Sequence, residues 1–234
     1  MPWTPDDAMH HALETNGEPG NSYSWCFSPD GIGSTFHTLV MDIPEEAFRE
    51  SMDRNIIRGS TVLVPSPSLL VDPGDPYVRI VADHILESIG DCSDRYRAVA
   101  TLNFVQTAIR YVSDDANYGC DEFWASPVET LYLHGGDCED QAVLLFSIFG
   151  AMNLDCVLLD YPSHVAVGVY VGDSDEYLFC EATSSVPMNL GWMPSKMKDQ
   201  IPEICIPGED DVLAVGVSKG FAWLRYIIKD VTGL

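Results

Sequence analysis

The fold of this chain is decided by one stretch, Gly135-Gly-Asp-Cys-Glu-Asp-Gln-Ala-Val-Leu-Leu-Phe-Ser-Ile-Phe-Gly-Ala-Met152. Its two glycines allow backbone angles that a side chain would forbid, so the turn that they form can be tight. The run after Cys138 is apolar on nearly every side, which is typical of a fully buried helix. We therefore expect Cys138 on the first turn of a central helix.

That position gives Cys138 the properties of a nucleophile. Free N–H groups and the helix dipole favour an anion at a helix N-terminus, and such a position lowers the pKa of a thiol from about 8.5. Three neighbours, Asp137, Glu139 and Asp140, act in the opposite direction, because negative charges raise a thiol pKa. A hard cation such as Ca²⁺ would relieve this conflict, although acidic residues are also common in the first turn of any helix.

A nucleophilic thiolate needs a base and a group that orients the base. Alternating patterns predict strands over residues 156–161, 164–171 and 177–183. If Gly172-Asp173 is a two-residue turn, His164 lies directly opposite Glu181 in an antiparallel pair. A register shift of two residues would keep both side chains on one face, whereas a shift of one would separate them.

Other residues compete for the remaining roles. His134 is an alternative base four residues before Cys138, but it lies in a loop with no strand to hold it. The backbone N–H of Cys138 would supply half of an oxyanion hole. The candidates for the second donor are Gln106, Tyr118 and Trp124. The aromatic residues that could form the walls of a narrow tunnel are Tyr118, Trp124, Tyr170, Phe179 and Trp192.

Three motifs in this order carry a family resemblance: Gly-Asp-Cys-Glu-Asp at residues 136–140, His-Val-Ala-Val-Gly-Val at 164–169, and Tyr-Leu-Phe-Cys-Glu-Ala-Thr at 177–183. Together with Phe123-Trp-Ala-Ser-Pro-Val-Glu-Thr-Leu131, they resemble the transglutaminase-like superfamily, and most closely its archaeal and bacterial cysteine peptidases. The resemblance covers roughly residues 94–185.

The resemblance implies an α+β, papain-like core in which the central helix with the nucleophile packs on an antiparallel sheet. It implies a catalytic triad of Cys138, His164 and Glu181, with glutamate where most of the superfamily has aspartate. The implied function is a thiol-dependent acyl hydrolase or transferase, foremost a cysteine peptidase acting on protein or peptide substrates. The alternatives are an amine-transferring transglutaminase and a non-catalytic binding or scaffold module.

No cofactor is required by this chemistry. Some bacterial relatives bind calcium next to the catalytic cysteine, which makes Asp137, Glu139 and Asp140 candidate calcium ligands here. No Cys-x-x-Cys pair offers zinc geometry, and no glycine loop of the phosphate-binding type is present.

We expect three segments: an N-terminal extension with a β-hairpin and a short helix (1–75), a catalytic core (76–186) and a C-terminal segment docked on the core (187–234). The first 22 residues read as a loose lead-in. Amphipathic helices are predicted over Tyr77–Ile89 and Asp94–Tyr111, the latter capped by Asp94. Ser126-Pro127-Val128-Glu129 is a capping box. The chain reads as irregular between residues 183 and 208.

Composition limits the choice of partner. There are 36 acidic and 12 basic residues, with a net charge of −24, which argues against nucleic acid and anionic membranes, since both need a basic face. The longest apolar run is too short to span a bilayer. Seven cysteines, an odd number, suit a reducing compartment, so we expect a cytoplasmic protein, with a trimmed extracellular domain as the alternative. Five other cysteines are expected to be core thiols or at most to form one structural disulfide: Cys92, Cys120, Cys156, Cys180 and Cys205.

Overall fold

The computed structural model describes residues 4–16, 20–29, 33–54, 56–59, 66–172, 175–207 and 213–214. The helices are α1 (Pro5–Asn16), α2 (Glu45–Met52), α3 (Pro76–Ile89), α4 (Asp94–Ala108), α5 (Asp114–Tyr118), α6 (Pro127–Leu133) and α7 (Cys138–Ala151), with short 3₁₀ helices at Pro67–Leu70 and Ser195–Met197. The strands are β1 (Ser22–Phe27), β2 (Thr35–Val40), β3 (Arg110–Tyr111), β4 (Gly135–Gly136), β5 (Asp155–Tyr161), β6 (His164–Tyr170), β7 (Leu178–Cys180), β8 (Glu203–Cys205) and β9 (Leu213–Ala214).

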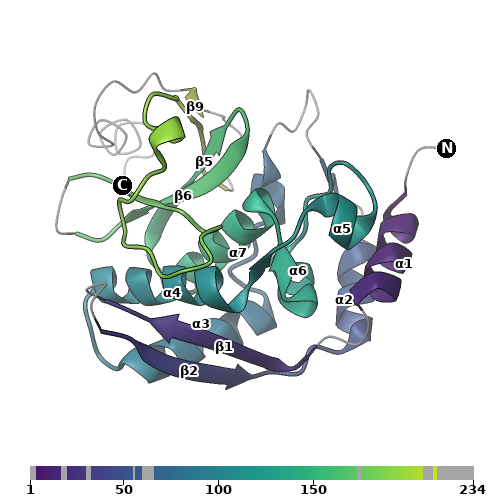
Figure 1. Ribbon diagram of the computed structural model, residues 1–234, viewed down its shortest axis with the longest axis horizontal. Coiled ribbons are helices and arrows are strands. Elements are labelled where there is room, and N and C mark those ends of the chain that lie inside the picture. Colours follow the sequence, from purple (N-terminus) through teal and green to yellow (C-terminus); the bar gives the residue numbers. More distant parts are fainter. Residues whose placement is uncertain are drawn as a thin grey trace.

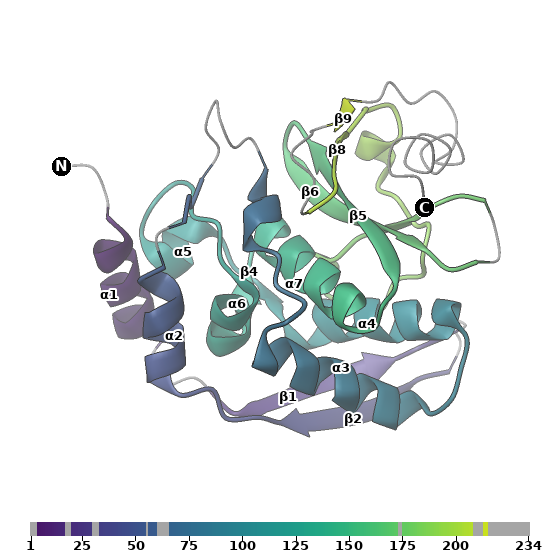
Figure 2. The same cartoon turned by 180° about the vertical axis from the view of Figure 1, so that it is seen from behind.

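Helix α7 occupies the centre of the molecule. It packs against α3, α4 and α6 on one side and against β5 and β6 on the other, and the β1–β2 hairpin covers the far side of α3 and α4 (Figures 1 and 2). Nearly every side chain from Glu139 to Phe149 is buried, as the apolar run predicted. The sheet on which α7 packs is antiparallel, in the order β7-β6-β5-β8-β9. The expected α+β fold, with the cysteine-bearing helix on an antiparallel sheet, is confirmed.

The register of β6 with β7 differs from the expected one by two residues. Val167 pairs with Cys180 and Val169 with Leu178, whereas the two-residue turn predicted Val167 opposite Leu178. Strand β6 ends at Tyr170 and β7 begins at Leu178, so each strand is one residue shorter than expected at the end next to their connection. Part of that connection lies outside the described residues. Because side chains alternate with period two, both faces of the strands are nevertheless the predicted ones.

Several elements were not predicted. Residues 5–16 form α1, which buries Ala8, Met9 and Ala12, so the expectation of a loose lead-in was wrong. The cap of α4 is Ser93 instead of Asp94, since the Ser93 hydroxyl accepts from the Tyr96 N–H. The region expected to be irregular contributes β8, which pairs with β5. The apolar segment at 221–228, expected to dock on the core, lies outside the described residues.

The turn that leads into α7 is held in place by a buried carboxylate, that of Asp140. Asp140 is fully buried; its Oδ1 accepts from the Ala125 N–H at 2.7 Å and its Oδ2 from the Asp137 N–H at 3.3 Å. Asp137 caps the helix in return, completing a capping box. The carboxylate reaches this position only because Gly136 has no side chain: a Cβ there would lie 2.6 Å from Asp140 Cβ and 2.7 Å from its Oδ2.

We predict that Gly136→Ala lowers the free energy of unfolding by about 2 kcal/mol, because the added methyl group must displace buried Asp140 from its hydrogen bonds. Urea unfolding measures the change. Gly20→Ala is the control, since a Cβ at Gly20 meets nothing within 4 Å, and it should change stability by less than about 1 kcal/mol. Equal stability of the two variants would contradict the role given to this contact.

Candidate active site

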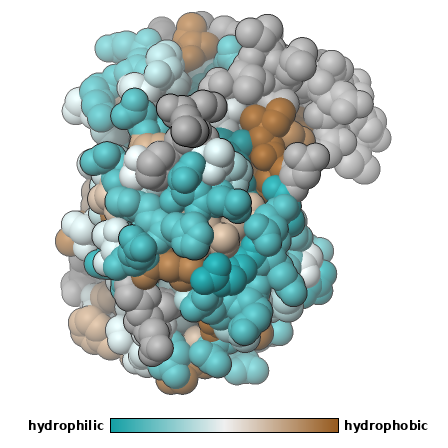
Figure 3. Space-filling model, turned by 90° about the vertical axis from the view of Figure 1, so that its right-hand side faces the viewer, coloured by the Kyte–Doolittle hydropathy of each residue, from teal (hydrophilic) through white to brown (hydrophobic). Residues whose placement is uncertain are grey.

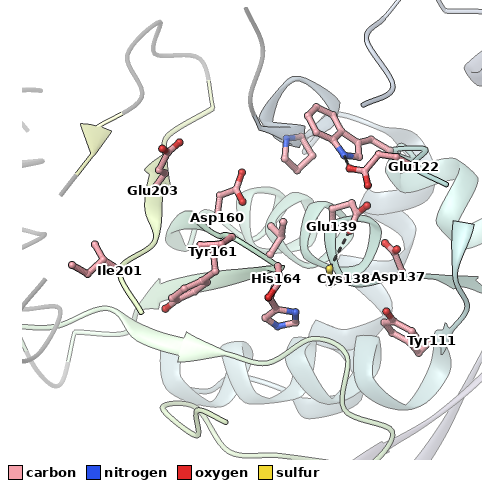
Figure 4. Close-up of a pocket in the computed structure, with 15 residues that line it drawn as sticks. Tyr111, Glu122, Asp137, Cys138, Glu139, Asp160, Tyr161, His164, Ile201 and Glu203 are labelled. Atoms are coloured by element: carbon pink, nitrogen blue, oxygen red, sulfur yellow. Dashed lines mark hydrogen bonds between the residues drawn. The ribbon is translucent and has the colours of Figure 1, made fainter. Parts of the chain in front are cut away.

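A pocket of about 600 Å³ opens at the start of α7. It is lined by Pro67, Tyr111, Glu122, Trp124, Asp137, Cys138, Glu139, Asp160, Tyr161, Pro162, Ser163, His164, Val165, Ile201 and Glu203, most of which Figure 4 labels. Cys138 enters from the first turn of α7, and His164 from the first residue of β6. The backbone N–H of Val165 lowers the pKa of the Cys138 thiol, which places the sulfur close to the start of β6.

His164 is held by Glu181. Its Nε2 lies 3.1 Å from both carboxylate oxygens. The observed register places Glu181 one position beyond the end of β7, diagonal to His164 instead of directly opposite. Diagonal neighbours are farther apart than opposed ones but within reach of long side chains. The extra methylene of glutamate relative to aspartate therefore suits this strand pairing. The pair predicted from the sequence does meet, by a different register.

Glu181 is itself fixed by its neighbours. The Thr183 hydroxyl and N–H donate to Glu181 Oε1 at 2.7 and 3.2 Å. Burial raises the pKa of Glu181, but the hydrogen bonds from His164 and Thr183 outweigh burial, and the pKa lies below its usual value. The Gln106 amide donates to the Glu181 backbone carbonyl at 2.8 Å and accepts from the Met188 N–H at 2.9 Å. Gln106 thus supports the acid, and because it is buried and does not line the pocket, its candidacy as an oxyanion-hole donor is overturned.

The pKa of the Cys138 thiol is raised, contrary to the expectation from its place at a helix N-terminus. Burial is the largest cause, followed by the charge of Glu139 and the hydrogen bond that the thiol donates to Glu139 Oε2 at 3.1 Å. The Val165 N–H opposes the rise. The helix dipole acts on all N-termini alike, but here desolvation and an adjacent carboxylate are the larger effects.

Carboxylates from three segments converge beside the thiol. Oxygens of Asp114, Asp137 and Asp140 lie within 4.8 Å of one another, as do those of Asp114, Glu122 and Glu139. Burial and mutual repulsion raise the pKa of the Asp114, Asp137 and Asp140 carboxyls. The sequence motif predicted only Asp137, Glu139 and Asp140. Asp114 in α5 and Glu122 in the following loop join them because of the chain topology, which no local pattern reveals.

Most of the other sequence candidates lie outside the pocket. The His134 ring stacks on Tyr23 at 4.1 Å, and its Nε2 hydrogen-bonds to the Gly20 carbonyl, so it is not a rival base. Tyr118 is fully buried against Phe123. Trp124 lines the pocket, but its Nε1 donates to Glu122 at 2.8 Å. The other expected tunnel walls, Tyr170, Phe179 and Trp192, do not line this pocket.

Figure 3 shows one face as mainly hydrophilic, with hydrophobic residues in small separate groups. All seven cysteines are free thiols. In the described ranges, no helix combines the length and the apolar character needed to cross a membrane.

Comparisons with known proteins give likenesses at the level of structure only. No family profile and no curated protein matches the sequence. Among solved structures, LapG from Legionella pneumophila is similar at 18% identity and a TM-score of 0.42, over 58% of this chain and 85% of that one. Its calcium-bound form gives 19% identity and a TM-score of 0.41, over 66% and 91%.

A candidate cysteine protease from Cytophaga hutchinsonii is similar at 18% identity and a TM-score of 0.39, over 53% of this chain. This chain covers only 44% of that protein. A TGase crystal structure gives 13% identity and a TM-score of 0.39, over 71% of this chain and 46% of that one. At this level of similarity, the function of the chain has to be argued from its own site.

We predict that Glu139→Gln accelerates alkylation of Cys138 by iodoacetamide in EDTA. The amide keeps the shape of the side chain but removes the charge that raises the thiol pKa, so at about pH 8 the rate should rise about tenfold for each unit by which the pKa falls. Mass spectrometry of the peptide containing Cys138 measures the rate. Glu203→Gln, at a pocket carboxylate that is not among the causes of the Cys138 shift, should change it less than about twofold. Unchanged or slower labelling of Glu139→Gln would refute this explanation of the shift.

Proposed function

We propose that this protein is a thiol-dependent acyl hydrolase of the transglutaminase-like superfamily, acting as a cysteine peptidase. In this proposal Cys138 is the nucleophile, His164 the general base and acid, and Glu181 the group that orients the imidazole. The observation that supports it most is the contact at 3.1 Å between Glu181 and His164, because His164 lines the pocket that also holds Cys138. Nucleophile, base and orienting acid are the constellation that covalent acyl transfer requires.

The hydrogen bonds of His164 support a separate role for each of its ring nitrogens. Because Nε2 of His164 faces Glu181, the Nε2–H donates to the carboxylate and Nδ1 is the nitrogen left to take the thiol proton. The Cys138 thiolate attacks the carbonyl carbon of the substrate, a C–S bond forms, and the π electrons of the carbonyl move to its oxygen. Collapse breaks the C–N bond, and His164 gives its proton to the leaving amine. Water then resolves the thioester with His164 as base.

Two features of the pocket favour hydrolysis of cationic substrates. Of the five aromatic residues expected to form a tunnel, only Trp124 lines the pocket, so the tunnel expected to exclude water does not surround this site. The lining contains five carboxylates and, among the described residues, neither lysine nor arginine. Asp160 and Glu203 pair directly across β5 and β8, and burial followed by the charge of Glu203 raises the pKa of Asp160 to about 6. Peptides rich in lysine and arginine are therefore the expected substrates.

The acidic cluster fits a calcium ion. Asp114 Oδ1 and Asp137 Oδ1 are buried without a hydrogen-bond partner, and Asp114 is only 3% exposed. Unpaired buried carboxylate oxygens are costly, and an all-oxygen donor set suits Ca²⁺. We propose Asp114, Asp137, Glu122 and Glu139 as ligands; both oxygens of Asp140 already accept backbone N–H groups. When bound, the ion would neutralise the carboxylates beside Cys138 and favour its thiolate.

We predict that Cys138→Ala abolishes cleavage of a library of lysine- and arginine-rich peptides, and that His164→Ala lowers kcat/KM by at least about 100-fold. Glu181→Gln should lower it by about tenfold or more, because the amide no longer stabilises the imidazolium. Mass spectrometry of the products measures cleavage. Glu87→Gln on the exposed side of α3 is the matched control for charge and should match wild type.

The same assay with a labelled primary amine separates hydrolysis from amine transfer. Cleavage without incorporation of the label supports the peptidase. Incorporation into glutamine-containing peptides without backbone cleavage would replace the hydrolase by a transferase and leave the roles of Cys138 and His164 intact.

We also predict that calcium chloride raises the melting temperature relative to EDTA. A ligand at about 100 times its Kd adds about 2.7 kcal/mol to stability, which corresponds to roughly 5–10 °C for a chain of this size. Asp114→Asn should reduce the shift, and Asp83→Asn, at an exposed position of α3, should not. No shift in wild type, or an equal shift in Asp114→Asn, would contradict the assigned ligands.

A further inference from the structure

We propose that the hydroxyl of Tyr111 is the second donor of the oxyanion hole, acting together with the backbone N–H of Cys138. This assignment rests on the proposed function, because an oxyanion forms only if Cys138 attacks a carbonyl. It makes Tyr111 a catalytic residue that the sequence analysis did not consider.

The placement of Tyr111 follows from strand pairing. Strand β3 runs parallel to β4, with Tyr111 in register with Gly136, two residues before Cys138, and the Val112 N–H donates to the Gly136 carbonyl at 3.1 Å. The backbone of Tyr111 is thus tied to the turn that delivers the nucleophile. A donor fixed in this way needs no rearrangement when the oxyanion forms, which is what makes such donors effective.

The side chain of Tyr111 lies in the pocket. It belongs to the lining, and 59% of it is exposed, so a substrate can reach it. Figure 4 shows its hydroxyl turned toward Asp137 and Cys138, whereas Tyr161, on the other side of His164, turns its hydroxyl away from the thiol. Partial desolvation, followed by the charges of Asp137 and Cys138, raises the pKa of the Tyr111 phenol to about 12. The hydroxyl therefore keeps its proton at neutral pH and can donate it in a hydrogen bond.

The three donors considered from the sequence are occupied or out of reach. The Gln106 amide donates to the Glu181 carbonyl, and the Trp124 indole N–H donates to Glu122. The third, Tyr118, is fully buried and outside the pocket lining.

In the reaction, the C–S bond forms and the carbonyl π electrons become a lone pair on oxygen. The N–H of Cys138 is at the first position of α7, where N–H groups have no intrahelical acceptor, and it donates to that oxygen from one side. The phenol O–H of Tyr111 donates from the other. Neither proton is transferred, so both donors are unchanged when the tetrahedral intermediate collapses.

The test compares two reactions of one thiol in calcium-containing buffer. Acylation of Cys138 by 4-nitrophenyl acetate passes through an oxyanion, whereas alkylation by iodoacetamide does not. Both rates are measured by mass spectrometry of the peptide containing Cys138, with Cys138→Ala as the blank. We expect Tyr111→Phe to slow acylation by about 100-fold and to change alkylation by less than about twofold. Tyr96→Phe, at an exposed tyrosine on α4, should match wild type in both reactions.

The outcomes are distinguishable. Unchanged acylation in Tyr111→Phe would overturn the assignment, because the hydroxyl would then have no role in the reaction. An equal loss in acylation and alkylation would also overturn it, because the substitution would then have altered the reactivity of the thiol itself. In the peptide assay, a higher KM with unchanged kcat would assign Tyr111 to ground-state substrate binding and would likewise overturn it. Wild type that reacts with neither reagent at Cys138 would overturn the proposed function, and this assignment with it.

Discussion

The position of the thiol depends on the buried carboxylate of Asp140. By accepting from the Ala125 and Asp137 N–H groups, it joins the segment before α6 to the turn before α7 and so sets where Cys138 enters the pocket. The position of Asp140 also requires glycine at residue 136, because a Cβ there would lie too close to the Asp140 side chain. The apolar remainder of α7 then secures the helix between the α3–α4 layer and the sheet, so that Cys138 and His164 on β6 line the same pocket. Local hydrogen bonds position the nucleophile, and core packing positions its partner.

The same arrangement has an electrostatic cost. Burying carboxylates close together raises their pKa values and that of the thiol between them, which opposes formation of a thiolate. Groups with strongly shifted pKa values are concentrated at functional sites. The unpaired oxygens of Asp114 and Asp137 support the proposal of a bound cation, and the neighbouring Asp160 and Glu203 on β5 and β8 support the proposal of a cationic substrate.

Around the site, the sequence was sufficient where a strong local pattern determines the structure, although it missed α1 and the Ser93 cap of α4. The glycine pair and apolar run predicted α7, and alternation predicted both faces of β6 and β7. It was insufficient where distant segments meet. The register shift depends on a long connection, and the partner of Glu181 is therefore a diagonal one. Asp114 and Tyr111 approach Cys138 through α5 and β3, with no motif of their own. The thiol pKa was mispredicted because the helix dipole is visible in a sequence, whereas the degree of burial is not.

The central claim is that Cys138 and His164 form one nucleophilic unit. The most direct test exposes the folded protein to an electrophilic peptide carrying lysine residues and locates the adduct by intact-protein and peptide mass spectrometry. The account predicts a single adduct on Cys138 that is absent in Cys138→Ala and abolished or greatly slowed in His164→Ala, with unchanged circular dichroism in both variants. Absence of an adduct in well-folded wild type, or an equal rate in His164→Ala, would contradict it and favour a binding module that keeps the fold without the chemistry.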